Sequence, residues 1–409
     1  MSGPTIPIAD LDPSDPAFLA DPYPTYAALR PQRVQWAEGV QSWVAADYRS
    51  VVELSKSRFF VRSAEPAHAV DDASRTLQRV EGADHARLRS TVAPAFRGAS
   101  VRRLAADIAH LADGLVAGCC AGATADLMSE LAHPLSIRAV AIVLGLPGED
   151  LDALIEWTAV IAAAMGPAPP AAARSSAMAA GEAIAEYVAR VGEARRRQPR
   201  DDLVSRLVGD RRLSRGEGLA MIRLLLFTGS HPMALALGNA LLLLARRPEQ
   251  WETLLRRPAL VPRAVEECLR FDPVIQMTSR RALATVDVAG RRIEAGDEVI
   301  LLCGSANRDE GVFRRPDVFD VMRDPNPHLT FGRGTHACLA PMLARLEVGA
   351  ALESMVRRRV AIRSAGRPRR LASPVLRGLE RLPARLEPAR CGALGRDPGQ
   401  SERGGAAGV

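Results

Sequence analysis

One short segment, FGRGTHACLA (residues 331–340), combines residue types that can hold and tune a reactive metal. Gly332 and Gly334 allow a tight turn in which backbone N–H groups converge, because glycine adopts left-handed conformations without strain. Cys338 follows where a helix should begin, and the helix dipole and free N–H groups at that position favour a thiolate. A thiolate held in this way is a good axial ligand for haem iron, because it donates electron density that helps to cleave an O–O bond.

Other roles for Cys338 have weaker support in the sequence. A lone cysteine is more often a small buried apolar residue. A zinc site needs three or four ligands, and only His336 is near; covalent haem attachment needs a CxxCH motif, which is absent. The 6 cysteines form no CxxC pair in this chain of 409 residues, which is typical of a protein from a reducing compartment. We therefore expect a cytoplasmic protein.

The cysteine segment resembles the cysteine-ligand loop FGxGxHxC of the cytochrome P450 family, with Phe331, Gly332, Gly334, His336 and Cys338 at the matching positions. The resemblance runs from DPYPTYAALR through ANRDEGVF and DPNPHLTFG to VLRGLERLPARL, and it is greatest to the soluble bacterial members. It implies haem b as the cofactor, with Cys338 as the iron ligand. It also implies the cytochrome P450 fold, which is mainly α with a small β subdomain.

The same resemblance implies a set of contacts to the haem propionates. His85 and Arg89 in DHARLR lie one helical turn apart; taken alone, they could equally be a solvent-facing basic stripe. Arg280 and His336 match further propionate contacts of the family. Four cationic or donor groups for two carboxylates are chemically sensible, because buried charge must be paired.

A helical pair, Glu267 and Arg270 in AVEECLR, shares one helix face at i,i+3. Alone it could be a weak surface ion pair, but it resembles the structural ExxR pair of the family. The family's third partner is usually an arginine or histidine before the cysteine loop, where this chain has Val318. Either the triad is incomplete, or its third member is one of Arg314, Arg315 and Arg323.

The apolar segment LLLFTGSHPMALALGNALLLLA (224–245) predicts a long helix, interrupted by Pro232. In most cytochromes P450 this stretch carries an acid–alcohol pair that relays protons to bound dioxygen. Aligned on GNALL, Gly229 is kept, while His231 stands at the acid position and Pro232 at the alcohol position. Pro232 should kink the helix over the haem.

Three explanations remain for the altered pair. His231 or Ser230 takes over the relay, the substrate brings its own hydroxyl, or the chemistry bypasses this step. His231 could also be only a satisfied core histidine. We assign Gly229, Ser230, His231 and Pro232 to the catalytic region on this basis.

The rest of the chain predicts one haem domain over residues 21–390, between an irregular segment (1–20) and a disordered tail (391–409). Helical spacing dominates from 84 to 196 and again up to 271, with a helix-breaking loop at 165–176. Short strands are expected between 274 and 302, and SPVLRGLERLPARLE favours a final hairpin.

Charge and apolarity exclude two classes of partner. The net charge is +7, but the arginines are scattered without aromatic neighbours, so we expect no nucleic-acid partner. The apolar segment 224–245 contains His231, Pro232 and Asn239, so we expect no membrane span.

The function favoured is a monooxygenase that hydroxylates or otherwise oxidises a small or medium hydrophobic organic molecule of secondary metabolism. Two alternatives stay open: haem-thiolate chemistry without monooxygenation (nitrene, peroxide or dehydration type), and a catalytically silent haem protein that binds a ligand. Electrons would come from a ferredoxin and its reductase, with docking on a basic face around Arg333 and Arg345. Pocket positions are expected within 62–80, 222–235, 274–279 and 374–377.

Overall fold

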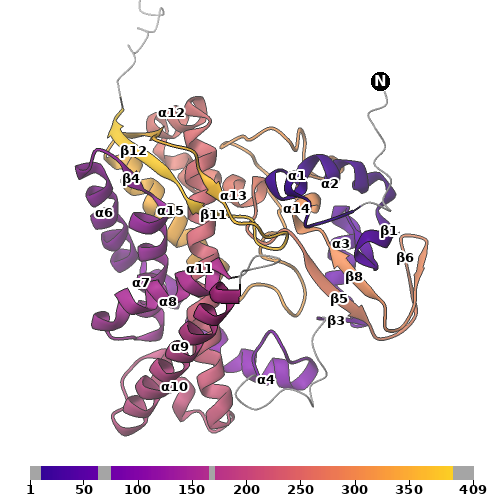
Figure 1. The fold of residues 1–409 in the computed structure, drawn as a ribbon, viewed down its shortest axis with the longest axis horizontal. Coiled ribbons are helices and arrows are strands. Elements are labelled where there is room, and N and C mark those ends of the chain that lie inside the picture. The colour runs from indigo at the N-terminus through magenta and orange to yellow at the C-terminus, as the bar shows by residue number, and fades with distance from the viewer. Residues whose placement is uncertain (1–10, 63–74, 165–170, 390–409) are drawn as a thin grey trace, which may run out of the picture.

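The computed structural model describes residues 11–62, 75–164 and 171–389. The expected tail at 391–409 and residues 1–10 of the expected irregular segment lie outside these ranges. Helices form one side of the molecule, while most of the strands lie on the other side together with the N-terminal helices (Figure 1). The chain is therefore mainly helical with a minor β part, as the sequence predicts.

The helices with the bounds of each are as follows: α1 (Pro16–Ala20), α2 (Tyr23–Leu29), α3 (Tyr48–Lys56), α4 (Gly82–Val92), α5 (Gly98–Arg103), α6 (Ala105–Ala121), α7 (His133–Leu144), α8 (Leu151–Ala163), α9 (Ala171–Arg197), α10 (Leu203–Gly209), α11 (Arg215–Ala245), α12 (Pro248–Arg256), α13 (Val261–Phe271), α14 (Cys303–Ala306) and α15 (Pro341–Arg357).

The strands form four small sheets. The largest has the order β1 (Val34–Ala37), β2 (Ser42–Ala45), β8 (Glu298–Leu301), β5 (Thr278–Ala282) and β3 (Phe60–Val61). A second sheet has the order β4 (Ala125–Asp126), β12 (Pro383–Pro388) and β9 (Val360–Ser364). Two further pairs are β6 (Val286–Val288) with β7 (Arg291–Ile293), and β10 (Arg369–Arg370) with β11 (Leu379–Arg381).

The central helix α11 begins with a complete capping box. The Ser214 hydroxyl accepts a hydrogen bond from the Glu217 N–H, and the Glu217 carboxylate accepts one from the Ser214 N–H, both at 3.0 Å. The helix is apolar on nearly every side, because α7, α13 and α15 pack around it in the main hydrophobic core. By length and composition it could also cross a membrane, but its burial inside the protein is that of a core helix. Pro232 lies inside it, and the helix continues past this residue to Ala245.

Three local expectations are corrected by the structure. Residues 16–20, expected to be irregular, form α1, because Pro16 suits a first helical turn and Asp15 caps the Ala17 N–H at 2.8 Å. The loop predicted at 165–176 ends by Ala171, where α9 begins; residues 165–170 lie outside the described ranges. The expected terminal hairpin does not form, because β11 pairs with β10 while β12 pairs with β9 and β4.

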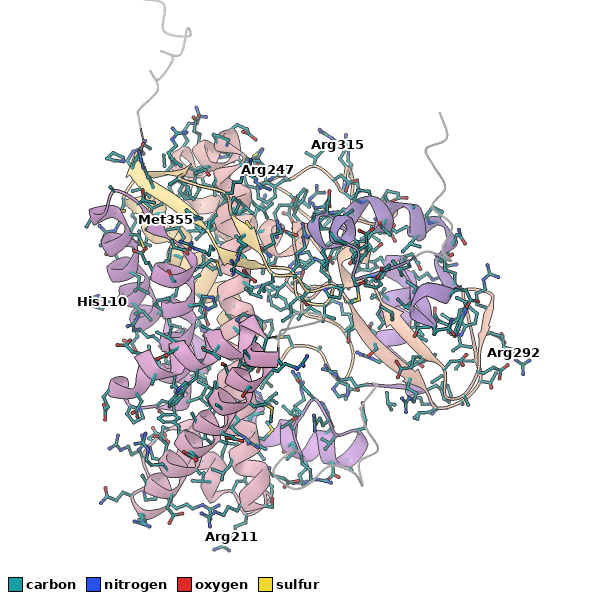
Figure 2. The ribbon with its side chains drawn as sticks, in the orientation of Figure 1. His110, Arg211, Arg247, Arg292, Arg315 and Met355 are labelled. Carbon is teal, nitrogen blue, oxygen red and sulfur yellow. The ribbon has the colours of Figure 1, made fainter. Side chains whose placement is uncertain are left out.

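The scattered charge expected from the sequence is visible on the structure. Arg211, Arg292 and Arg315 are exposed and project from three separate edges of the molecule (Figure 2).

Candidate haem site between α11 and the cysteine loop

Two adjoining cavities lie between α11 and the cysteine loop. The helix-side cavity, lined by residues of α4, α11 and 336–340, has a volume of about 700 Å³. The sheet-side cavity, lined by residues of α3, α11, β5 and 329–338, has a volume of about 1240 Å³, including space open to solvent. The two share five lining residues: Arg62, Gln78, Thr228, His336 and Cys338. Because they share these residues, the two cavities adjoin in front of Cys338 and Thr228.

The cysteine loop is held by backbone contacts that need both of its glycines. Gly332 and Gly334 have φ values of +66° and +76°, which favour glycine strongly. A Cβ on Gly334 would lie 2.1 Å from the carbonyl oxygen of Ser55 in α3, so this glycine also permits the loop to approach α3. The Cys338 N–H donates to the carbonyl of Phe331 at 2.8 Å and closes the loop.

Cys338 is exposed, because its side chain faces the two cavities. It precedes the first residue of α15, Pro341, by three positions and is not itself in the helix. Loss of solvation in this setting raises the pKa of its thiol, although the Ala340 N–H and nearby Arg89 favour the thiolate. The helix start therefore does not make this thiol acidic by itself, and a bound cation is needed to hold it as a thiolate.

Six basic side chains line the cavities around Cys338: Arg62, His85, Arg89, Arg280, Arg333 and His336. Four of them are the propionate contacts expected from the sequence; Arg62 and Arg333 are additions. The rings of His85 and His336 are 4.5 Å apart between centroids. No ion pair joins Arg62, Arg89 or Arg280 to a carboxylate within residues 11–62, 75–164 and 171–389.

The electrostatics of this basic cluster show that its charge is poorly compensated. Burial, followed by the neighbouring cations His336 and Arg89, lowers the pKa of His85 to about 4. Burial and the charge of Arg62 lower the pKa of Arg280. Glu81 is the acidic partner that the structure supplies, with its carboxylate 2.8 Å from Nε2 of His336. Burial works to raise the pKa of Glu81, but hydrogen bonds from His336 and from the Arg62 N–H leave it lowered.

These features fit a dianionic iron cofactor. Arg62, Arg89 and Arg280 have no carboxylate partner among the described residues, and such cations are costly to bury unless a ligand brings negative charge, as the two propionates of haem do. Cys338 supplies a soft sulfur ligand to the same space, which suits haem iron. We predict that Cys338 ligates the iron and that Arg89, Arg280, His85 and His336 hold the propionates.

Of the four α11 residues assigned to the catalytic region, Gly229 and Pro232 line the cavities, whereas Ser230 and His231 do not. Thr228 and Gly229 line the helix-side cavity, and Thr228, Pro232 and Met233 line the sheet-side cavity. Ser230 and His231, which we expected as substitute proton carriers, line neither cavity. The physical reason is the helical rotation of about 100° per residue, which turns positions 230 and 231 away when 228, 229 and 232 face inward.

Ser230 and His231 instead contact the protein interior. The Ser230 hydroxyl donates to the carbonyl of Leu226 at 2.7 Å. The His231 ring stacks between His133 and Phe227, at centroid distances of 5.8 and 5.9 Å, and neither of its nitrogens has a hydrogen-bond partner among the described residues. Burial, and then His133, lowers the pKa of His231 to about 4, so the ring is neutral near pH 7.

Gly229 is required by helix packing as well as by the cavity. A Cβ at this position would lie 2.6 Å from Cγ2 of Val140, a buried residue of α7. The glycine therefore lets α7 and α11 approach closely on one side while its backbone lines the cavity on the other.

Below the site, Glu267 and Arg270 are both fully buried and form two hydrogen bonds of 2.8 Å. Arg323 supplies the third member of the triad: its Nε lies 3.0 Å from Oε2 of Glu267. Of the three arginines that the sequence left open, the structure therefore selects this one.

The docking face expected around Arg333 and Arg345 stays a prediction, and the structure shows what the two arginines contact. Arg345 is neutralised by Glu266, with contacts of 2.6 and 2.8 Å, and its guanidinium stacks 4.6 Å from the ring centre of Phe331. Arg333 lines the sheet-side cavity. Arg345 therefore links the cysteine loop to Glu266 of α13, and its charge is partly balanced there.

Several cavity residues were missed by the sequence or anticipated only as ranges. Arg62, Leu77, Gln78, Val274, Ile275 and Thr278 lie in the expected pocket ranges and line the cavities, whereas none of residues 374–377 does; residues 63–74 lie outside the described chain. The sequence alone indicated no role for Thr228 or Glu81. The position of Thr228 next to the kept Gly229 was the one sequence feature that could have pointed to it.

Comparisons with known proteins identify the family of the chain. The family model for cytochrome P450 matches residues 171–369. Nocardicin C N-oxygenase of Nocardia uniformis subsp. tsuyamanensis is 37% identical over 372 residues, covering 87% of this chain and 92% of that protein. Cytochrome P450 monooxygenase PikC of Streptomyces venezuelae is 34% identical over 399 residues, covering 93% and 94%. The crystal structure of CalO2 superposes with a TM-score of 0.85 at 33% identity, covering 92% of this chain and 99% of that one. The chain belongs to the cytochrome P450 family, and it is a haem-thiolate monooxygenase of the soluble bacterial type that acts on an organic molecule.

Proposed function

We propose that the protein uses haem b to transfer an oxygen atom to a small or medium hydrophobic molecule of secondary metabolism. The observation that carries this proposal is the position of Cys338, which faces a shared cavity opposite Thr228 and Gly229 of α11. Bound haem supplies the thiolate-ligated iron that activates dioxygen for oxygen transfer. The names of the relatives, an N-oxygenase and a monooxygenase, support oxygen transfer without identifying the substrate.

The residues of the chain have three tasks in this reaction. Cys338 holds the iron, and the basic cluster of Arg89, Arg280, His85 and His336 anchors the propionates. Apolar walls bind the substrate by excluding water; they include Leu225 and Leu77 of the helix-side cavity and Ala236, Val274 and Ile275 of the sheet-side cavity. Water or the substrate must supply the protons at the Thr228 face, because Ser230 and His231 point elsewhere.

Electrons come, in this proposal, from a ferredoxin and ferredoxin reductase in the cytoplasm. The net charge of +7 favours an acidic small protein as the donor. Because Arg345 forms an ion pair with Glu266, we expect other arginines to supply most of the positive charge of the docking surface.

The central test is spectroscopic. The reduced protein treated with carbon monoxide should show the absorption band of thiolate-ligated haem, and Cys338→Ser should abolish it. Persistence of this band in the serine variant would exclude Cys338 as the ligand. A panel of small hydrophobic molecules should then be screened by the shift that each causes in the haem absorption band, and the products analysed for a gain of one oxygen atom.

A second candidate function follows from one feature, the presence of Pro232 on the cavity where an alcohol is usual. Proline has no side-chain proton to deliver, so peroxide-driven oxidation that needs no dioxygen activation is the alternative. Turnover with NAD(P)H, ferredoxin, reductase and dioxygen should be compared with anaerobic turnover driven by hydrogen peroxide. Product formed only from peroxide would favour the second function, and product in neither assay would favour a silent haem protein.

A further inference from the structure

The cavity-facing side of α11 carries an unusual pair, Thr228 and Pro232, spaced one helical turn apart. Both line the sheet-side cavity, and Thr228 also lines the helix-side cavity, so they lie at the junction where substrate and cofactor must meet. Both residues are half-buried, which leaves their atoms within reach of a ligand.

The first available polar atom is the Thr228 hydroxyl oxygen. Its proton is already committed, because Oγ1 donates to the carbonyl of Leu224 at 2.7 Å. A hydroxyl oxygen has two acceptor lone pairs besides its single proton. Toward the cavity this oxygen is therefore an acceptor.

The second polar atom is the backbone carbonyl oxygen of Thr228. In an α-helix this carbonyl receives the N–H of the residue four positions later, which here is Pro232. Proline has no N–H, and its ring pushes the carbonyl of the i−4 residue aside. The carbonyl points along the helix toward residue 232, which places it on the same cavity-facing side.

We propose that Thr228 and Pro232 form an acceptor notch that selects substrates by a hydrogen-bond donor, either a hydroxyl or an N–H group. Two acceptor oxygens lie together, and neither has a proton to offer. A ligand that brings an O–H or N–H can donate to one of them, whereas an ether or a pure hydrocarbon can donate to neither, at a cost in affinity. Thr228 is thus a specificity-determining residue, and Pro232 is a positioning residue that frees its carbonyl. The inference rests on the proposed function, because the notch discriminates only ligands that enter the haem cavity.

The test compares two probes that differ in donor capacity, cyclohexanol and cyclohexyl methyl ether. Dissociation constants are measured from the shift of the haem absorption band in haem-loaded wild type, Thr228→Val, Pro232→Ala and the double variant. Wild type should bind the alcohol about five- to tenfold more tightly than the ether, the range of one hydrogen bond. Valine removes the hydroxyl acceptor at nearly constant size, and alanine restores the N–H that occupies the carbonyl. In each single variant the preference for the alcohol over the ether should fall about threefold. In the double variant the two probes should bind equally tightly.

A matched control is Thr158→Val on α8. Thr158 makes the same back-bond, from its hydroxyl to Leu154 at 2.7 Å, but it does not line either cavity. This variant should keep the wild-type preference. If wild type does not prefer the alcohol, or if the double variant keeps that preference, the notch is refuted. The carbon monoxide spectrum is recorded first, so that a protein without thiolate-ligated haem, which refutes the proposed function, is distinguished from an intact haem protein that lacks the notch.

Discussion

Arg323 donates from Nε to Oε2 of the fully buried Glu267 at 3.0 Å, and this contact completes an ion cluster that joins α13 to the segment before the cysteine loop. The backbone N–H of Asp320 and the amide of Asn326 also donate to the Glu267 carboxylate, at 3.0 and 3.2 Å. Arg323 reaches back to carbonyls of residues 314, 315 and 318 as well. Arg323, five residues beyond Val318, is thus the third partner of the Glu267–Arg270 pair that the family resemblance implies.

Arg323→Ala should destabilise the haem-loaded protein by about 3 kcal/mol, because it removes one partner of a buried carboxylate. The measurement is the free energy of unfolding in urea. Arg263→Ala is the control: Arg263 pairs with Asp324 at 2.9 Å nearby, but both side chains are more than half exposed, at 51% and 61%. Such a pair is worth about 0–1 kcal/mol. Equal losses in the two variants would contradict a structural role for Arg323.

Arg280→Gln should speed the loss of haem. Arg280 is buried and faces the cavities, and its pKa is lowered by burial and by Arg62, so a propionate is the partner that its charge lacks. The rate of haem transfer to an excess of apomyoglobin should rise about tenfold, the effect of losing one charged hydrogen bond. Arg281→Gln serves as the neighbour control, since Arg281 is exposed and pairs with Glu298 at 3.0 Å. A transfer rate as fast in the Arg281 variant would show that the effect is not specific to the cavity.

Glu347→Gln should stabilise the protein at alkaline pH. Glu347 of α15 is 1% exposed, and its two carboxylate oxygens have no hydrogen-bond partner among the described residues. Burial raises the pKa of this carboxyl well above its usual range, and this outweighs the opposing influence of Ser136. The carboxyl is therefore neutral in the folded state while it ionises in the unfolded state.

The sign of this pH dependence follows from that difference. Because the folded pKa is raised, the contribution of Glu347 to stability is greatest below the unfolded pKa of about 4.5 and is lost as pH rises toward the folded pKa. Glutamine does not titrate. Urea unfolding from pH 4.5 to 8.5 should show an advantage of Glu347→Gln over wild type that grows with pH. A variant that is less stable than wild type at pH 8.5 would show that Glu347 is ionised and paired in the fold.

Gly229→Ala should cost about 1–3 kcal/mol of stability by overpacking, because the new methyl group would lie 2.6 Å from Val140 Cγ2. A second substitution, Val140→Ala, should recover much of this loss, and a double-mutant cycle measures the coupling. Gly181→Ala on α9 is the matched control, since a Cβ there meets nothing within 4 Å and alanine favours the helix by up to about 1 kcal/mol. Additive effects of the Gly229 and Val140 substitutions would argue against the close contact.

The cysteine loop and the ExxR pair could be found from sequence because their chemistry depends on short, fixed spacings, whereas the basic residues expected at the propionates came from the resemblance to the family. Cys338 and the two loop glycines lie within seven residues, and Glu267 and Arg270 lie within one helical turn. The mainly α fold was equally accessible, since it follows from local spacing of apolar residues and from turn signals. The order in which the C-terminal strands pair was not, because β12 pairs with residues that are 20 or more positions away in the chain.

Only the tertiary structure decided which face of α11 meets the cavities. The helix is apolar on nearly all sides, so no amphipathic stripe in its sequence marks a direction. Packing against α7 sets the rotation: Gly229 must face Val140, and Thr228 and Pro232 then turn toward Cys338 while His231 stacks on His133. Arg323 is a similar case, because its selection over Arg314 and Arg315 depends on how a long loop folds back on α13. Both results depend on contacts between residues that are far apart in the chain, and local sequence patterns do not predict such contacts.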